Sequence, residues 1–192
     1  MKRVCVYCAS STKIDNKYYE AASKLAKSLV DADYAINYGG GAVGLMGVVA
    51  DTVLEHEGNI TGIIPHFMVE VEWEHKGVEK MVHVNTMAER KMKLIQDVDA
   101  VIALPGGSGT LEELTEVLSM KKLGLFTKPV ILLNVDGFYN PLVELFNKMI
   151  DQNFMRPDHR QLWTIVESPE EIVEAIRTAP AWGEDAMKLA AV

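Results

Sequence analysis

A glycine-rich loop follows an apolar segment near the middle of the chain. Residues 99–104 are Asp-Ala-Val-Ile-Ala-Leu, and residues 105–113 continue as Pro-Gly-Gly-Ser-Gly-Thr-Leu-Glu-Glu. This order is typical of a buried strand that passes through a loop into a helix, and the N–H groups and positive dipole end of such a helix suit an anion. The segment therefore predicts a phosphate site. The residues expected to surround the phosphate are Gly106, Gly107, Ser108, Gly109 and Thr110.

A second glycine loop lies earlier in the chain. Residues 39–47, Gly-Gly-Gly-Ala-Val-Gly-Leu-Met-Gly, follow the strand-like segment 34–38, and two such loops in one short chain indicate a nucleotide ligand. Gly39, Gly41 and Gly44 also match the G-x-G-x-x-G spacing of dinucleotide folds. That interpretation requires an acidic residue at the end of the next strand, where this chain has Pro65, so the pattern disfavours NAD.

Charged residues beside these loops have two possible roles. Glu113 completes a Thr-x-x-Glu capping box with Thr110, as Glu89 does with Thr86, so it needs no catalytic role. Its position one turn behind an anion loop instead favours a carboxylate that works with a cation. Arg90 and Lys91 supply that cation at the start of a predicted helix, the end that disfavours positive charge. The alternative for this basic pair is a solvated helix face.

The elements that must position these residues alternate between strand and helix. Apolar runs of four to seven residues alternate with segments of helical periodicity, which predicts βαβ units and a parallel sheet covered on both faces. The predicted strands are 3–8, 34–39, 60–65, 80–84, 99–104, 129–134 and 163–166. The predicted helices are 15–31, 43–57, 86–97, 110–123, 139–152 and 169–178. The fold class is thus α/β, Rossmann-like and doubly wound, with a mainly parallel sheet and helices on both faces.

We expect one nucleotide-binding domain over residues 1–180 and a C-terminal tail over 181–192. Ligands of open parallel sheets bind at the carboxyl ends of the strands, which is where both glycine loops, residues 9–11 and Pro65 fall. One crevice at that edge can therefore gather all four segments. Ser10 and Gly40 are among the residues expected to bind the ligand there.

The charge and the residue composition exclude several classes of binding partner. A net charge of −8 and the lack of a Lys/Arg-rich cluster argue against nucleic acid, and the sequence has no apolar run of the roughly 20 residues that span a bilayer. We expect no membrane association and a cytoplasmic location. Cys5 and Cys8 form a CxxC on a predicted strand, where they point to opposite faces, so we interpret them as buried packing residues. The five histidines show no metal-ligand spacing, so we expect neither a metal nor a cofactor.

Taken together, these motifs resemble the Lonely Guy family, the cytokinin riboside 5′-monophosphate phosphoribohydrolases that are often mislabelled as lysine decarboxylases. The resemblance covers residues 3 to about 176, and the paired PGGxGTxxE and MxxRK motifs are its most specific part. The shared segments are 8–11, 39–47, 87–91, 105–113 and 133–137. Ala9 and Ala88 depart from the family pattern, in which a glycine and a histidine are usual.

The resemblance implies that the chain hydrolyses the N-glycosidic bond of AMP or an N6-modified AMP, giving free base and ribose 5-phosphate. It also implies a homodimer. Arg90 and Glu113 would be the catalytic pair, while Met87, Lys91, Thr110 and the glycine loops would bind phosphate and ribose. The residues themselves agree, because a carboxylate can stabilise an oxocarbenium-like ribose and activate water, whereas an arginine is a poor proton donor. The alternatives are a nucleotide-binding module without catalysis and a pyridoxal phosphate-dependent lysine decarboxylase.

Overall fold

The computed structural model describes residues 1–69, 74–183 and 186, and its centre is a seven-stranded parallel sheet. The strand order is β4-β3-β2-β1-β5-β6-β7. The strands are β1 (Lys2–Tyr7), β2 (Tyr34–Tyr38), β3 (Ile60–Pro65), β4 (Lys80–Val84), β5 (Ala100–Ala103), β6 (Val130–Leu133) and β7 (Thr164–Val166). These seven strands pair in parallel throughout, and the registers include Val4 beside Ile36 and Val6 beside Ile102. The predicted fold class is confirmed.

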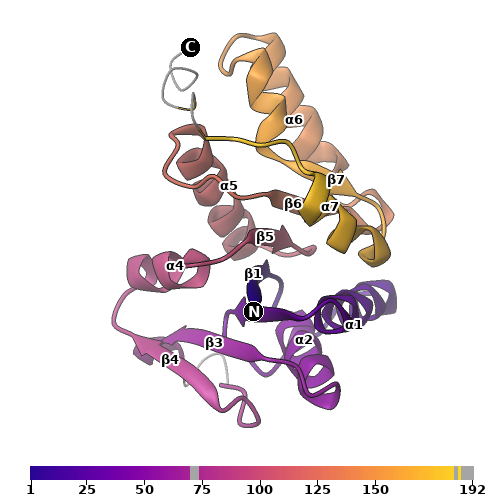
Figure 1. The fold of residues 1–192 in the computed structure, drawn as a ribbon, viewed down its shortest axis with the longest axis vertical. Coiled ribbons are helices and arrows are strands. Elements are labelled where there is room, and N and C mark those ends of the chain that lie inside the picture. The colour runs from indigo at the N-terminus through magenta and orange to yellow at the C-terminus, as the bar shows by residue number, and fades with distance from the viewer. Residues whose placement is uncertain (70–73, 184–185, 187–192) are drawn as a thin grey trace.

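Helices cover both faces of this sheet (Figure 1). The helices are α1 (Asn16–Asp31), α2 (Gly44–Glu55), α4 (Met87–Ile95), α5 (Ser108–Lys122), α6 (Asn140–Asp151) and α7 (Ile172–Thr178). Helices α1, α2 and α7 share one apolar core with Val4 and Ile36, whereas α4, α5 and α6 share the other with Cys5 and Val101. Strand residues thus alternate between two buried layers, which explains why the strands are continuous apolar runs.

Strand β1 marks the point where the strand order reverses. Its neighbours are β2 on one side and β5 on the other. From β1 the chain adds β2, β3 and β4 outward on one side, and it then returns to add β5, β6 and β7 outward on the other side. In a doubly wound sheet this reversal opens a crevice at the carboxyl ends of the two central strands. The segments that follow β1 and β5, which are residues 8–11 and 104–110, therefore meet there.

Cys5 and Cys8 are both buried, and they belong to the cores on opposite faces of the sheet, as predicted for packing residues. None of the helices in the described ranges combines the length and the apolar character needed to cross a membrane. Groups of three or more residues suited to hold a metal are likewise absent from the part of the chain that the structure describes.

The last turn of helix α5 contains a buried lysine. Lys121 lies on the same helical stripe as Leu114, Val117 and Leu118, and only 1% of its surface is exposed. The Trp182 Nε1 donates a hydrogen bond of 2.6 Å to the Lys121 carbonyl, so the start of the expected 181–192 tail packs on the sheet domain. Most of that tail lies outside the described residues. Burial lowers the pKa of the Lys121 ammonium from 10.5 to about 8.

This shift predicts that Lys121→Met stabilises the protein near neutral pH. Below pH 8 both states carry the ammonium and its burial opposes folding; between pH 8 and 10.5 only the unfolded state keeps the proton, so stability rises with pH. We expect the variant to gain roughly 1–3 kcal/mol at pH 7 and less at pH 10. Urea unfolding of both proteins at the two pH values measures this. A loss of stability at pH 7, or an equal gain at both values, would contradict the assignment.

Candidate active site

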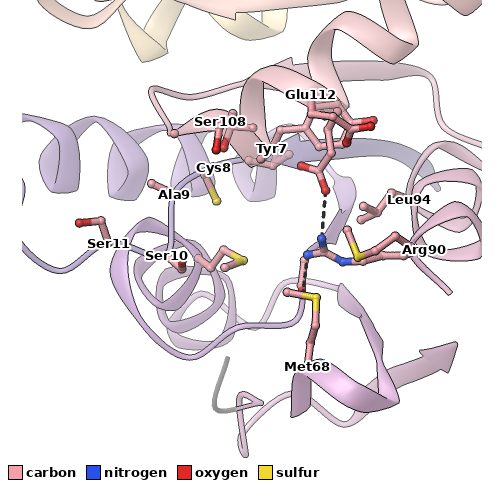
Figure 2. Close-up of a pocket in the computed structure, with 18 residues that line it drawn as sticks. Tyr7, Cys8, Ala9, Ser10, Ser11, Met68, Arg90, Leu94, Ser108 and Glu112 are labelled. Atoms are coloured by element: carbon pink, nitrogen blue, oxygen red, sulfur yellow. Dashed lines mark hydrogen bonds and ion pairs between the residues drawn. The ribbon is translucent and has the colours of Figure 1, made fainter. Parts of the chain in front are cut away.

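A pocket of about 310 Å³ lies at the carboxyl edge of the sheet, where the segments after the central strands β1 and β5 meet. Figure 2 shows the side chains that line it. Segments after β1, β2 and β5 line it together with α4 and α5. The described lining residues are Val6, Tyr7, Cys8, Ala9, Ser10, Ser11, Gly39, Met46, Met68, Met87, Arg90, Leu94, Gly107, Ser108, Gly109, Thr110, Glu112 and Glu113. Its size is at the lower end of the range of small-molecule sites. A crevice is therefore present at the predicted edge, and three of the four expected segments line it, whereas Pro65 is not among the described lining residues.

An ion pair between Arg90 and Glu113 lies in the wall of the pocket. The Arg90 Nη1 donates to the Glu113 Oε1 at 3.1 Å, and the exposed fractions are 6% for Arg90 and 9% for Glu113. The same guanidinium donates from Nε to the Ile63 carbonyl and from Nη2 to the Gly39 carbonyl, each at 3.1 Å. Three separate segments thus hold one cation, which fixes its plane and direction.

Helix α4 carries Arg90 into this position. Thr86 caps the helix, because its hydroxyl accepts a hydrogen bond from the Glu89 N–H at 3.1 Å, while the Glu89 carboxylate accepts one from the Asn85 N–H at 2.8 Å. Arg90 and Leu94, four residues apart, are the residues that α4 buries. The helix therefore directs a cation into the protein interior close to its own positive end, a costly arrangement that the Glu113 carboxylate offsets.

Gly39 is needed because Arg90 passes close to it. A Cβ added at Gly39 would lie 2.4 Å from the Arg90 Nη2 and 2.8 Å from the Met46 Sδ. Any side chain there would push the guanidinium away from the Gly39 carbonyl that it binds. This glycine therefore serves the arginine, in addition to lining the pocket.

The N-terminus of α5 forms another wall of the pocket. Its first intrahelical bond runs from the Leu111 N–H to the Gly107 carbonyl at 3.0 Å, so the amides before Leu111 lie ahead of the helical hydrogen-bond ladder. The first turn of α5 holds no acidic residue, and no side chain caps it. Among the described residues, no atom lies within 4 Å of a Cβ added at Gly107 or Gly109. The helix end is thus open to an anion, as its sequence predicts.

The other glycine loop differs from this arrangement. The amides of Leu45 and Met46, at the start of α2, donate to the Ala9 carbonyl at 2.9 and 3.3 Å. Gly44 makes this contact possible, because its φ is +63° and a Cβ there would lie 2.5 Å from the Ser10 backbone. The start of α2 therefore holds the chain after β1, and of this loop's four predicted ligand glycines only Gly39 lines the pocket. Gly40, Gly41 and Gly44 do not.

The capping-box interpretation of Thr110 and Glu113 is wrong. Helix α5 begins at Ser108 with Gly107 as its N-cap, two residues earlier than predicted, so Thr110 already lies inside the first turn. Both side chains are buried, and Glu113 reaches Arg90 instead of the helix start. The pattern failed here because glycines 106, 107 and 109 allowed an earlier start. The same pattern at Ser168 and Glu171 does form a capping box.

Lys91 binds two carboxylates of α5 at the edge of the pocket. Its Nζ lies 2.6 Å from the Glu112 Oε1 and 2.9 Å from the Glu116 Oε2, and it is not among the described lining residues. The other basic residue of the pair, Arg90, and the predicted ligand residue Met87 do line the pocket, as do Ser10 and the 107–110 loop. Gly106 lies behind the loop, where a Cβ would clash with Thr110.

Several lining residues carried no chemical signal in the sequence. Met46 and Met68 belong to the pocket wall, and Tyr7 lies at its floor, with only 3% of its surface exposed. Burial, followed by the negative charge that the Cys5 thiol and Glu113 would place nearby, raises the pKa of the Tyr7 hydroxyl well above its usual range. The Tyr7 hydroxyl therefore stays protonated. The methionines come from α2 and from the segment after β3, so only the fold brings them together.

Comparison with known proteins identifies the family of this chain. Residues 46–176 match a family model described as "possible lysine decarboxylase". A probable cytokinin riboside 5′-monophosphate phosphoribohydrolase of Oryza sativa subsp. japonica is 42% identical over 175 residues, which cover 91% of this chain and 72% of that protein. A cytokinin riboside 5′-monophosphate phosphoribohydrolase of Arabidopsis thaliana is also 42% identical, over 91% of this chain and 77% of that protein.

Solved structures support the same architecture at low sequence identity. The molybdenum cofactor carrier protein of Chlamydomonas reinhardtii has a TM-score of 0.70 at 18% identity, covering 93% of this chain and 97% of that one. The molybdenum cofactor binding protein of Rippkaea orientalis has a TM-score of 0.69 at 23% identity, covering 93% and 97%. These structures share the fold of a Rossmann-like α/β protein. Within that class, the sequence matches show that this chain belongs to the Lonely Guy family, to which the two plant relatives named above also belong.

The ion pair predicts a specific pattern of stability. Glu113→Ala removes the negative charge beside a buried guanidinium, and we expect it to lower the free energy of unfolding by about 3–5 kcal/mol. Glu113→Gln keeps an acceptor for Arg90 and should lose less, roughly 1–2 kcal/mol. Arg90→Met combined with Glu113→Leu removes both charges and should be more stable than Glu113→Ala. Urea unfolding monitored by circular dichroism measures all three, and wild-type stability of Glu113→Ala would contradict the electrostatic role of the pair.

Proposed function

We propose that this protein hydrolyses the N-glycosidic bond of a nucleoside 5′-monophosphate, AMP or an N6-substituted AMP, to give the free base and ribose 5-phosphate. The observation that carries the proposal is the buried Arg90–Glu113 pair in the same pocket as the open N-terminus of α5. An anion site and a positioned carboxylate in one pocket suit a substrate with a phosphate at one end and a cleavable sugar bond near it. The names of the plant relatives support the same reaction.

The phosphate would bind at the start of α5. The amides of Ser108, Gly109 and Thr110 precede the helical ladder, and the helix dipole adds positive potential at that point. Ser10, on the neighbouring segment after β1, lines the same pocket and offers a hydroxyl donor. Bound in this way, the phosphate would anchor the ribose between the α5 loop and the Arg90 guanidinium.

Glu113 would act on the sugar and the attacking water. As the bond from C1′ to the base nitrogen breaks, its electron pair leaves with the base and positive charge develops on the ribose. The carboxylate of Glu113 would stabilise that charge and take a proton from the water whose oxygen forms the new bond to C1′. The departing base takes up a proton. Arg90 would orient the carboxylate and bind substrate oxygens, since it does not release a proton at physiological pH.

The pocket lining argues against a lysine decarboxylase. Such an enzyme binds pyridoxal phosphate through a lysine side chain, and none of the described lining residues is a lysine. Lys91, the closest in sequence to the site, is paired with Glu112 and Glu116. The description attached to the matching family model therefore does not fit this pocket.

Turnover of AMP tests the proposal. We expect purified protein to release adenine from AMP, and to act at least about a hundredfold more slowly on adenosine, because the remote phosphate holds the sugar in a reactive position. Glu113→Gln should lose activity by roughly a thousandfold or more while it still binds AMP, since glutamine keeps the shape but cannot accept the proton. Chromatography measures adenine and calorimetry measures binding. AMP binding without adenine release by the wild type would favour a binding module instead, and equal rates on adenosine and AMP would contradict the phosphate site.

We also propose that the protein is a homodimer that uses the outer faces of α4 and α5. An apolar groove runs between these helices, opposite the pocket face of α4. Most of the described residues that line it are apolar, namely Ala88, Met92, Ile95, Met120, Leu125 and Phe126, and Glu89, Lys93 and Gln96 of α4 complete the lining. Met92 is 55% exposed and Leu125 is 69% exposed, which is unfavourable for large apolar side chains unless a second copy covers them. A partner there would lie next to the helices that carry Arg90 and Glu113.

The dimer proposal predicts a mass near twice 21.3 kDa at micromolar concentration. Met92→Glu combined with Leu125→Glu would place two charges in the groove and should shift the protein to the monomer, because an unpaired charge in an apolar interface is costly. Light scattering coupled to gel filtration measures both masses. A fully active wild-type monomer would contradict the proposal. The control variant is Lys27→Met, which changes an exposed residue of α1 and should leave the mass unchanged.

A further inference from the structure

A second set of ion pairs joins α4 and α5 beside the Arg90–Glu113 pair. Lys91 follows Arg90 on α4, and its Nζ lies between two carboxylates of α5, 2.6 Å from the Glu112 Oε1 and 2.9 Å from the Glu116 Oε2. Only 18% of the Lys91 side chain is exposed, so water screens these contacts less than it screens most surface ion pairs. The hydrogen bonds to Glu112 and Glu116 raise the pKa of the Lys91 ammonium, which keeps it charged.

The two sets of contacts join the helices at different points. Consecutive helical residues point about 100° apart, so Arg90 and Lys91 leave α4 in different directions, as Glu113 and Glu112 leave α5. The inner pair lies in the pocket and the outer set lies at its edge. Glu112 and Glu116 are four residues apart and therefore on one face of α5. Two contacts in different directions fix both the distance between α4 and α5 and the rotation of each helix about its axis.

The outer contact also balances charge near the phosphate site. Glu112 lines the pocket wall beside the start of α5, where a bare carboxylate would repel a phosphate. Lys91 neutralises that carboxylate without lining the pocket itself. Its ammonium is thus engaged by α5, and a role as direct phosphate ligand would require it to leave both partners.

We propose that Lys91 is a positioning residue, which binds Glu112 and Glu116 and thereby holds α4 against α5 in the arrangement that places Arg90 on Glu113. This inference rests on the proposed nucleotide hydrolysis. It assigns Lys91 a role through other residues, whereas the family resemblance implies contact with the substrate. The two roles make opposite predictions for the removal of its partners.

The decisive variant is Glu112→Gln combined with Glu116→Gln, which leaves Lys91 and every proposed substrate ligand in place. A positioning role predicts that kcat for AMP falls roughly tenfold while KM changes less than about threefold, because small displacements of catalytic groups act mainly on the chemical step. A phosphate-binding Lys91 would be released from its carboxylates, so KM would stay equal or fall and kcat would be retained. The second result would overturn the proposal.

Charge reversal provides the rescue. Lys91→Glu alone should lower kcat for AMP by more than about tenfold, because it places like charges between the helices. Adding Glu116→Lys, at the partner that is not among the described lining residues, restores one opposite-charge pair and should recover most of that loss. A phosphate ligand cannot be rescued this way, so no recovery would overturn the proposal. Lys27→Met, which removes an exposed ion pair with Asp31 on α1, is the control and should keep wild-type kinetics.

The wild-type rate separates this proposal from the proposed function. Wild-type protein that binds AMP but releases no adenine contradicts the function, and the positioning role fails with it. Wild-type hydrolysis with unchanged kcat in both the Gln pair and Lys91→Met overturns only the role of Lys91. Thermal unfolding of each variant shows that it is folded, and Lys91→Arg, which keeps the charge, should retain kcat within about threefold of wild type.

Discussion

A guanidinium buried between two helices and a sheet is the constraint on which the site depends. Arg90 is almost fully removed from water, and a buried charge is tolerated only where an opposite charge and hydrogen-bond acceptors surround it. Glu113 supplies the charge, and the carbonyls of Gly39 and Ile63 supply acceptors from the ends of two strands. The arginine therefore joins α4, α5, β2 and β3 at one point. Any change that moves one of them also moves the pair proposed to act on the substrate.

The sheet topology determines where this pair can work. The reversal of strand order at β1 opens the carboxyl edge between the segments after β1 and β5, and α5 starts at that opening with its amides exposed. Helix α2 starts at the same edge, but the Ala9 carbonyl accepts its first amides. Two similar glycine loops thus have different roles, since one helix start holds the chain after β1 and the other remains open to an anion.

Much of the fold could be predicted from local pattern alone. Continuous apolar runs located all seven strands to within about two residues, because a strand buried on both faces tolerates few polar side chains. Helix starts were less certain, as α5 shows. Its Thr-x-x-Glu motif satisfies a local rule for a cap at Thr110, but the glycines before it let the helix begin at Ser108, and a long-range partner takes Glu113. Because the buried Arg90 needs an opposite charge, Glu113 pairs with it and does not cap the helix at Thr110.

The remaining features of the site depend on contacts between distant segments. Arg90 and Lys91 are adjacent and both cationic, so the sequence pattern does not distinguish them. The rotation of α4 nevertheless directs Arg90 to Glu113 and Lys91 to Glu112 and Glu116. That rotation follows from packing Leu94 into the core below α4, which turns the Arg90 side of the helix inward, since residues four apart share a helical face. The packing of Leu94, one helical turn from Arg90, thus determines which of the two basic residues pairs with Glu113 at the carboxyl edge of the sheet.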